Sequence, residues 1–101
     1  MYVQTKKELL DYIEQCTMDF QTEALHRYSA NYISREKNIS RNLVSQYLNE
    51  LVKEGILIKI NSRPVYFMHR KSLERLYDVK VTKSLFYSID ELMEVLLRSD
   101  Y

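Results

Sequence analysis

One stretch of sequence decides the fold: Asn38-Ile39-Ser40-Arg41-Asn42-Leu43-Val44-Ser45-Gln46-Tyr47-Leu48-Asn49-Glu50-Leu51-Val52-Lys53-Glu54-Gly55. Asn38 tolerates a positive φ and suits a tight turn, and Ser40 is a favoured helix N-cap. Apolar residues then recur at helical spacing, namely Val44, Leu48 and Leu51, joined by Tyr47 and Val52. Gly55, the single glycine of the chain, stands at the left-handed stop position. The pattern predicts a turn and then a helix over Ser40–Glu54.

The other side of this predicted helix is polar and carries Arg41, Asn42, Ser45, Gln46 and Asn49. Arginine, amide and hydroxyl side chains are the types that hydrogen-bond base edges, and recognition helices contact bases mainly with their first turns. The alternative is an ordinary solvated face, but such a helix would more often use Lys, Glu and Ala, which are better helix formers. The composition therefore favours DNA binding by this face, Asn49 included, with base contacts expected from Arg41, Asn42, Ser45 and Gln46.

A predicted β-hairpin follows the helix. Ile56-Leu57-Ile58-Lys59-Ile60 is rich in β-branched residues and predicts a strand, and Asn61-Ser62-Arg63 predicts the turn. Pro64 fits the start of an edge strand, and Val65–Met68 can pair back. A capped helix followed directly by a hairpin is typical of a winged helix-turn-helix. We therefore expect a mostly helical α+β domain with a two- or three-stranded β wing and an extra C-terminal helix.

Phosphate contacts are expected from a separate set of residues, namely Ser40, Lys59, Arg63 and Arg35. Ser40 would act both as a helix cap and as a phosphate contact, because helix N-termini attract anions. Arg63 at the wing tip would enter the minor groove or touch the backbone. The alternative for Arg63 is a solvated turn arginine.

The remaining segments give weaker signals. Thr5-Lys6-Lys7-Glu8 has capping-box spacing and predicts a helix starting after Thr5, while Met18–Tyr28 suits a helical turn or two, with Thr17–Asp19 as a candidate loop. Ser29 or Asn31 can cap the next short helix. Further on, Ser72–Tyr77 suggests a short helix or loop, Val79–Val81 a third strand, and Ser88–Glu91 a second capping box.

The helix after Ser88 has an apolar stripe made of Leu92, Val95 and Leu96, widened by Met93 and Leu97. It could pack on the domain, couple two subunits, or lead into another domain. We expect residues 1–78 to form the winged helix-turn-helix domain and residues 79–101 a C-terminal strand and helix extension.

Length and composition indicate one globular domain. The chain has 101 residues, 46% of them hydrophobic and 29% charged. No apolar run reaches the roughly 20 residues needed to span a bilayer, the N-terminus lacks a signal-peptide core, and a single cysteine excludes an intramolecular disulfide. These features predict a cytoplasmic protein without membrane partners.

The net charge of +1 conceals an asymmetry. Residues 27–75 carry ten Lys or Arg against four Asp or Glu, a net of +6, while the flanks carry five basic and ten acidic residues, a net of −5. A basic middle between acidic ends is typical of a domain with one phosphate-facing surface.

Enzymatic chemistry is not expected. His26, His69 and Cys16 lack metal-ligand spacing, and a chain with one glycine cannot form a phosphate loop that needs at least two. We therefore predict no catalytic residue, no metal site and no cofactor.

The central part of the chain also resembles a known family. Ile39–Leu51, then Lys53-Glu54-Gly55, then Ile58-Lys59-Ile60-Asn61-Ser62-Arg63-Pro64-Val65-Tyr66-Phe67 resemble the N-terminal winged-helix domain of LevR-like activators. These are phosphotransferase-regulated activators of sigma-54 RNA polymerase that switch on sugar-uptake operons. The chain departs from the family at Lys37, where members usually place an apolar residue.

The resemblance implies a fragment of a larger modular activator. In that family the DNA-binding domain is followed by an ATPase and by phosphorylatable regulatory domains, none of which fits in this chain. Any ATPase activity, and any contact with sigma-54 RNA polymerase, would then belong to absent domains toward which residues 79–101 lead.

The function expected on these grounds is sequence-specific binding of double-stranded DNA, with a possible homodimer through the C-terminal helix. The alternative is a winged helix that serves as a protein-interaction or dimerisation module. An apolar patch on the exposed side of Ser40–Glu54 would favour the module, and a polar face would favour DNA.

Overall fold

A computed structural model of the chain describes residues 2–98. Its elements, in chain order, are α1 (Tyr2–Met18), the 3-10 helix η1 (Thr22–Tyr28), α2 (Ala30–Lys37), α3 (Arg41–Lys53), β1 (Leu57–Ile60), β2 (Tyr66–His69), α4 (Arg70–Tyr77), β3 (Leu85–Phe86) and α5 (Ile89–Leu96). The predicted class is confirmed: the fold is a mostly helical α+β winged helix-turn-helix with a three-stranded sheet.

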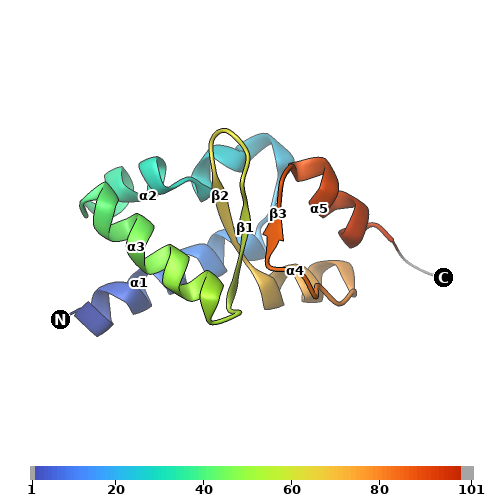
Figure 1. The fold of residues 1–101 in the computed structure, drawn as a ribbon, viewed down its shortest axis with the longest axis horizontal. Helices are drawn as coiled ribbons and strands as arrows, with labels where there is room; N and C mark the ends of the chain where they lie inside the picture. The colour runs from blue at the N-terminus through green and yellow to red at the C-terminus, as the bar shows by residue number, and fades with distance from the viewer. Residues whose placement is uncertain (1, 99–101) are drawn as a thin grey trace.

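The sheet stands in the middle of the molecule and separates two groups of helices. Its strand order is β2-β1-β3, with β1 and β2 antiparallel and β1 and β3 parallel. Helices α2 and α3 lie on one side of it and α4 and α5 on the other, while α1 runs behind the sheet and contacts both α3 and α4 (Figure 1). The molecule is accordingly elongated, with extents of 45 × 24 × 21 Å.

Alternation along β1 explains this arrangement. Side chains of successive strand residues point to opposite faces, so Leu57 and Lys59 share one face and Ile58 and Ile60 share the other. Leu57 belongs to the hydrophobic cluster formed with α1–α3, whereas Ile58 and Ile60 belong to the cluster formed with α4 and α5. Lys59 is therefore the single polar residue of a strand whose other members are fully buried.

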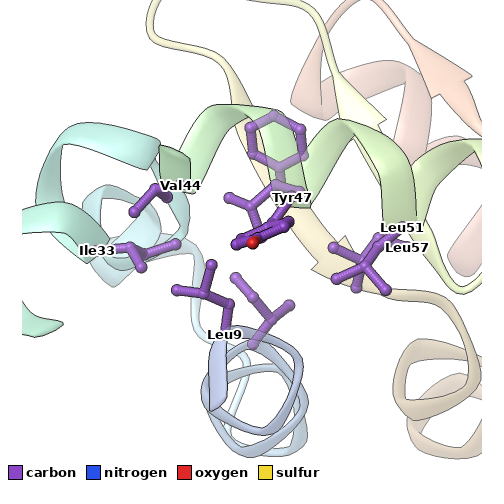
Figure 2. Packing of buried hydrophobic residues seen from close by; sticks show 9 residues of the cluster. Leu9, Ile33, Val44, Tyr47, Leu51 and Leu57 are labelled. Carbon is purple, nitrogen blue, oxygen red and sulfur yellow. The ribbon is translucent and has the colours of Figure 1, made fainter. Parts of the chain in front are cut away.

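The first cluster fixes α3 against α1 and α2. Leu9 of α1 points toward Ile33 of α2 and Val44 of α3, with Tyr47 at the centre (Figure 2). Val44 and Leu48 are fully buried and Leu51 is 2% exposed, as the predicted apolar stripe requires. This packing leaves the polar side of α3 facing outward.

The second cluster includes the C-terminal helix. Leu92 is fully buried and Leu96 is 1% exposed, and both pack with Phe86 of β3 and with β1. Of the three roles considered for this helix, packing on the domain is the one observed. Leu97, expected to widen the stripe, is exposed.

The local signals of the helix-turn-helix are confirmed. The Ser29 Oγ accepts the Tyr32 amide and caps α2, and the Ser40 Oγ accepts the Leu43 amide and caps α3. Asn38 ends α2 with φ 55°, in the left-handed region, and Gly55 follows α3 with φ 81°. The Ser88 Oγ likewise accepts the Glu91 amide at the start of α5.

The predicted position of the third strand was wrong. Residues 79–81 have no strand structure, and β3 lies at Leu85–Phe86. The backbone around Val81 is instead bonded to α4, because the Glu74 carboxylate accepts the Val81 amide and the Arg70 guanidinium donates to the Val81 carbonyl. Pairing with β1 begins only at Ser84, whose carbonyl accepts the Lys59 amide at 2.8 Å.

Two expectations about the first helix were also wrong. The helix begins at Tyr2 rather than after Thr5, so the Thr5–Glu8 spacing lies inside it, and neither Gly nor Pro precedes Thr5 to stop the helix from extending. Thr17 is not in a loop but within α1. It is buried, and its Oγ1 donates to the Ile13 carbonyl and accepts the His69 amide.

Lys37 does not occupy an apolar core position. It is exposed at the end of α2, and its ammonium lies 5.5 Å from the centre of the Tyr12 ring. Lys37, which departs from the pattern of the activators that the chain resembles, therefore lies at the surface, where its charge stays in contact with water.

Candidate nucleic-acid interface

The first two turns of α3 present the predicted polar residues. Arg41, Asn42 and Gln46 are exposed, and Ser45 is half-buried. They face outward because Val44, Leu48 and Leu51 are buried on the opposite side of α3 and so fix how the helix is turned about its own axis. Among residues 5–98, the large hydrophobic side chains that are exposed lie outside α3, at Met18, Leu76, Leu85, Tyr87 and Leu97.

A groove runs between α3 and the wing. It has a volume of about 390 Å³, and we call it the helix–wing groove. Its lining residues are Ser29, Ala30, Asn31, Arg41, Ser45, Asn49, Lys59, Ser62, Arg63, Pro64, Val65 and Phe67. The structure thus brings together five predicted site residues from α3, from β1 and from the turn between β1 and β2: Arg41, Ser45, Asn49, Lys59 and Arg63.

The helix–wing groove is positively charged. Three of its lining residues are cations, Arg41, Lys59 and Arg63, and its lining in the described part of the chain includes no carboxylate. A concave surface of one sign concentrates ions of the opposite sign. The groove is suited to a polyanion.

Asn49 and Lys59, which both line this groove, are bonded to each other. The Lys59 ammonium donates to Asn49 Oδ1 at 2.9 Å, and Asn49 Nδ2 donates to the Ser45 carbonyl at 2.9 Å. Lys59 also lies 5.8 Å from the centre of the Phe67 ring, its direct neighbour across the β1–β2 pairing. Asn49 therefore has both ends of its amide engaged within the protein.

Gln46 is held more loosely, through a chain of contacts that reaches α1. Its Nε2 donates to Glu50 Oε2 at 3.4 Å, and the Lys6 ammonium lies 3.1 Å from Glu50 Oε1 and 2.7 Å from Glu54 Oε2. The Lys6 contact, and to a smaller extent Gln46, lowers the pKa of Glu50. The contacts with Glu54 and then Glu50 raise the pKa of Lys6. Lys6 thus offsets the carboxylates of Glu50 in α3 and of Glu54 just after it, neither of which lines the cationic groove.

Arg35 lies outside the helix–wing groove. It lines a smaller neighbouring hollow of about 200 Å³ with Asn31 and Ser34. Asn31 lines both hollows and was not among the predicted site residues. The sequence feature that could have indicated Asn31 is its place two residues after the Ser29 cap, in the first turn of α2.

Ser40 and Asn42 do not line the groove, although both are exposed at the start of α3 beside Arg41. Arg70, a cation of the basic middle segment, has a different role. Its guanidinium donates to the carbonyls of Gly55, Val81 and Lys83 and to the Ser84 hydroxyl. Arg70 therefore fastens residues 81–84 to the turn after α3, and its charge does not belong to the groove.

Among residues 2–98, no group of three or more His, Cys, Asp or Glu side chains is placed to hold a metal ion. None of the described helices is both long and apolar enough to cross a membrane.

Comparison with curated proteins finds the transcriptional regulatory protein DagR of Salmonella typhimurium, which is 38% identical to this chain over 69 residues. The match covers 68% of this chain and 7% of DagR, so the chain spans only a small part of that protein. No protein-family model and no solved structure matches the chain.

Proposed function

We propose that this chain binds double-stranded DNA sequence-specifically, as the DNA-binding domain of a bacterial transcriptional regulator. The observation that carries the proposal is the helix–wing groove, which joins the polar turns of α3 to the wing and is lined by three cations. Similarity to a protein named as a transcriptional regulatory protein supports the regulatory context. In this assignment the protein acts in the cytoplasm and has no catalytic role of its own.

In the proposed complex α3 lies in the major groove and the wing lies over the adjacent backbone or minor groove. Arg41 is suited to guanine and Gln46 or Asn42 to adenine, with Ser45 beside them. Ser40, Arg63, Lys59 and Arg35 supply phosphate contacts that set the register. None of the exposed large apolar side chains found within residues 5–98 belongs to α3 or lines the helix–wing groove, so a protein partner at α3 is less well supported than DNA.

The finer assignment is that the regulator activates sugar-uptake operons through sigma-54 RNA polymerase under control of the phosphotransferase system. It rests on the resemblance of Ile39–Phe67 to LevR-like activators. Mapping the sites that the full-length protein occupies on the chromosome tests it. Binding sites upstream of sigma-54 promoters of sugar-uptake operons would support the assignment. Binding sites at promoters of another class would refute it.

A homodimer would bind two half-sites and raise affinity. Because Leu92 and Leu96 are buried within the domain, α5 could contribute to such a dimer only with its exposed side, together with Leu97, which follows the helix and is 63% exposed. Sedimentation of the chain with and without DNA would show whether two copies assemble.

The first test of DNA binding is an NMR titration with a mixed-sequence duplex of about 20 base pairs, at low salt and again at high salt. Shifts centred on Arg41, Asn42, Gln46 and Arg63 that fade as salt rises are expected, since phosphate contacts release counterions. If these residues do not shift even at low salt, the protein-interaction module becomes the better reading. The exposed apolar side chains would then be the surface to probe.

The variants Arg41→Ala and Arg63→Ala distinguish base recognition from phosphate contact. Arg41→Ala should reduce affinity for a selected site by about 1–3 kcal/mol and reduce non-specific affinity much less, because the base contact carries discrimination. Arg63→Ala should weaken binding to all sequences alike and lower the salt slope by about one contact. Equal losses on every sequence for Arg41→Ala would show that Arg41 is not a base reader.

A further inference from the structure

Asn49 shares a helix face with the predicted readers, but its amide is not available in the same way. Nδ2 donates to the Ser45 carbonyl and Oδ1 accepts from the Lys59 ammonium, both at 2.9 Å. The side chain is half-buried, whereas Asn42 and Gln46 are exposed. Paired recognition of adenine uses the donor and the acceptor of an amide together. Reading a base with Asn49 would therefore require both of its bonds to change.

The other end of this contact is fixed by the sheet. Lys59 is the one polar residue of β1 and lies between buried Ile58 and Ile60. Its ammonium sits near the ring of Phe67, the residue paired with it across the hairpin. The backbone amide of Lys59 donates to Ser84 of the segment leading into β3. The Lys59 position is thus set by neighbours on both sides in the sheet.

The Asn49–Lys59 contact therefore ties α3 directly to the wing. Lys59 precedes the wing turn, and Arg63 within that turn lines the same groove as Asn49 and Lys59. The direction in which the turn projects from α3 decides whether Arg63 reaches a phosphate while α3 lies in the major groove. A side-chain bond at the base of the wing is placed to fix that direction.

We propose that Asn49 is a positioning residue, which sets the wing against α3 through Lys59 and so holds Arg63 at the DNA backbone. This inference rests on the proposed DNA binding and assigns Asn49 a role other than base reading. It predicts that Asn49 and Arg63 are energetically coupled in binding although no contact joins their side chains among the interactions found within residues 2–98.

The test is a double-mutant cycle on a fluorescein-labelled, mixed-sequence duplex of about 20 base pairs at low salt. On such DNA a base reader contributes little, because binding to it relies on phosphate contacts. Asn49→Ala should nevertheless weaken binding several-fold, and the penalty of Arg63→Ala should shrink by at least about twofold in the Asn49→Ala background. The matched control is Asn42→Ala, an amide truncation on the same helix, in which the Arg63→Ala penalty should keep its wild-type size.

A conservative variant separates positioning from a general loss of structure. Asn49→Asp keeps an oxygen that accepts from Lys59, so the penalty of Arg63→Ala should return to its wild-type size even if the added negative charge lowers overall affinity. Thermal melts of every variant identify any that is unfolded at the assay temperature.

The outcomes distinguish the two levels of the proposal. If wild type binds the duplex and the Asn49→Ala and Arg63→Ala penalties simply multiply, the positioning role is refuted while DNA binding stands. If Asn49→Ala is silent on mixed-sequence DNA but changes the base preference in a selected library, Asn49 is a reader and the inference is wrong. If wild type does not bind duplex DNA at low salt, the proposed function fails and the inference fails with it.

Discussion

Replacing Leu92 by Ala should destabilise the entire domain rather than only its C-terminal helix. Leu92 is fully buried and packs in the second cluster with Phe86 of β3 and Ile58 and Ile60 of β1. Truncating a buried Leu to Ala costs about 2–5 kcal/mol, from the lost transfer free energy together with the cavity that remains. In a domain of this size each kcal/mol lowers Tm by about 4–8 °C, so we expect a fall of roughly 10 °C or more.

Leu97→Ala is the matched control. Leu97 directly follows α5 and is 63% exposed, so the same chemical change removes almost no buried surface. Its effect on the free energy of unfolding should stay within about 0.5 kcal/mol. The difference between the two variants therefore measures burial rather than side-chain chemistry.

The assay is urea unfolding followed by far-ultraviolet circular dichroism and by tyrosine fluorescence. A single unfolding unit gives coincident transitions by both probes, and Leu92→Ala should shift both to lower urea together. Equal effects of Leu92→Ala and Leu97→Ala would refute the reasoning. So would an early loss of a little helix in Leu92→Ala that leaves the main transition unmoved, since α5 would then be an appendage and not part of the core.

Three further predictions concern the local structure. Ser40→Ala should lower the free energy of unfolding by about 1 kcal/mol, because the Leu43 amide loses its cap. Ser40→Asp should keep the cap and the stability but weaken DNA binding, because it adds a negative charge. Urea unfolding measures the first effect and a DNA-binding assay the second. Asn38→Ala should lower the free energy of unfolding by about 1 kcal/mol, because φ is 55° at this position, whereas Asn38→Gly should lower it much less. Chemical denaturation measures both. Equal losses would mean that Asn38 is not needed for its left-handed conformation. Burial lowers the pKa of His69, so the unfolded state binds its proton more readily; stability should be fully present above about pH 6.5 and decrease as pH falls through the lower folded-state pKa. His69→Asn, which keeps a side-chain acceptor at the N-cap of α4, should flatten that part of the stability profile, and an unchanged profile would exclude His69 as its source.

The sequence by itself determined the local features of the helix-turn-helix. The caps at Ser29, Ser40 and Ser88 and the left-handed residues Asn38 and Gly55 follow from interactions within a few residues of each position. The apolar stripe of α3 follows from helical periodicity, and the polar face opposite it follows from the same periodicity. These features are local because the hydrogen bonds and backbone angles involved span at most one helical turn.

Distant contacts decided where several elements lie. The third strand lies at Leu85–Phe86 because side chains of α4, Arg70 and Glu74, bond the backbone around Val81. Thr17 stays within α1, and its hydroxyl accepts the amide of His69, 52 residues away. Such pairings depend on how the sheet and the helices meet, which periodicity does not encode.

Tertiary structure also divided the polar residues of α3 into two groups. From the sequence, Asn42, Gln46 and Asn49 are equivalent amides on one helix face. In the fold Asn42 and Gln46 remain exposed, whereas Asn49 is bonded to Lys59 of β1. Helical spacing fixes the direction in which each amide points, but the partner of Asn49 comes from a strand that the chain reversal at Gly55 brings beneath the helix. Only that reversal and the register of the sheet could decide which of these amides is bonded to the wing and which stay exposed.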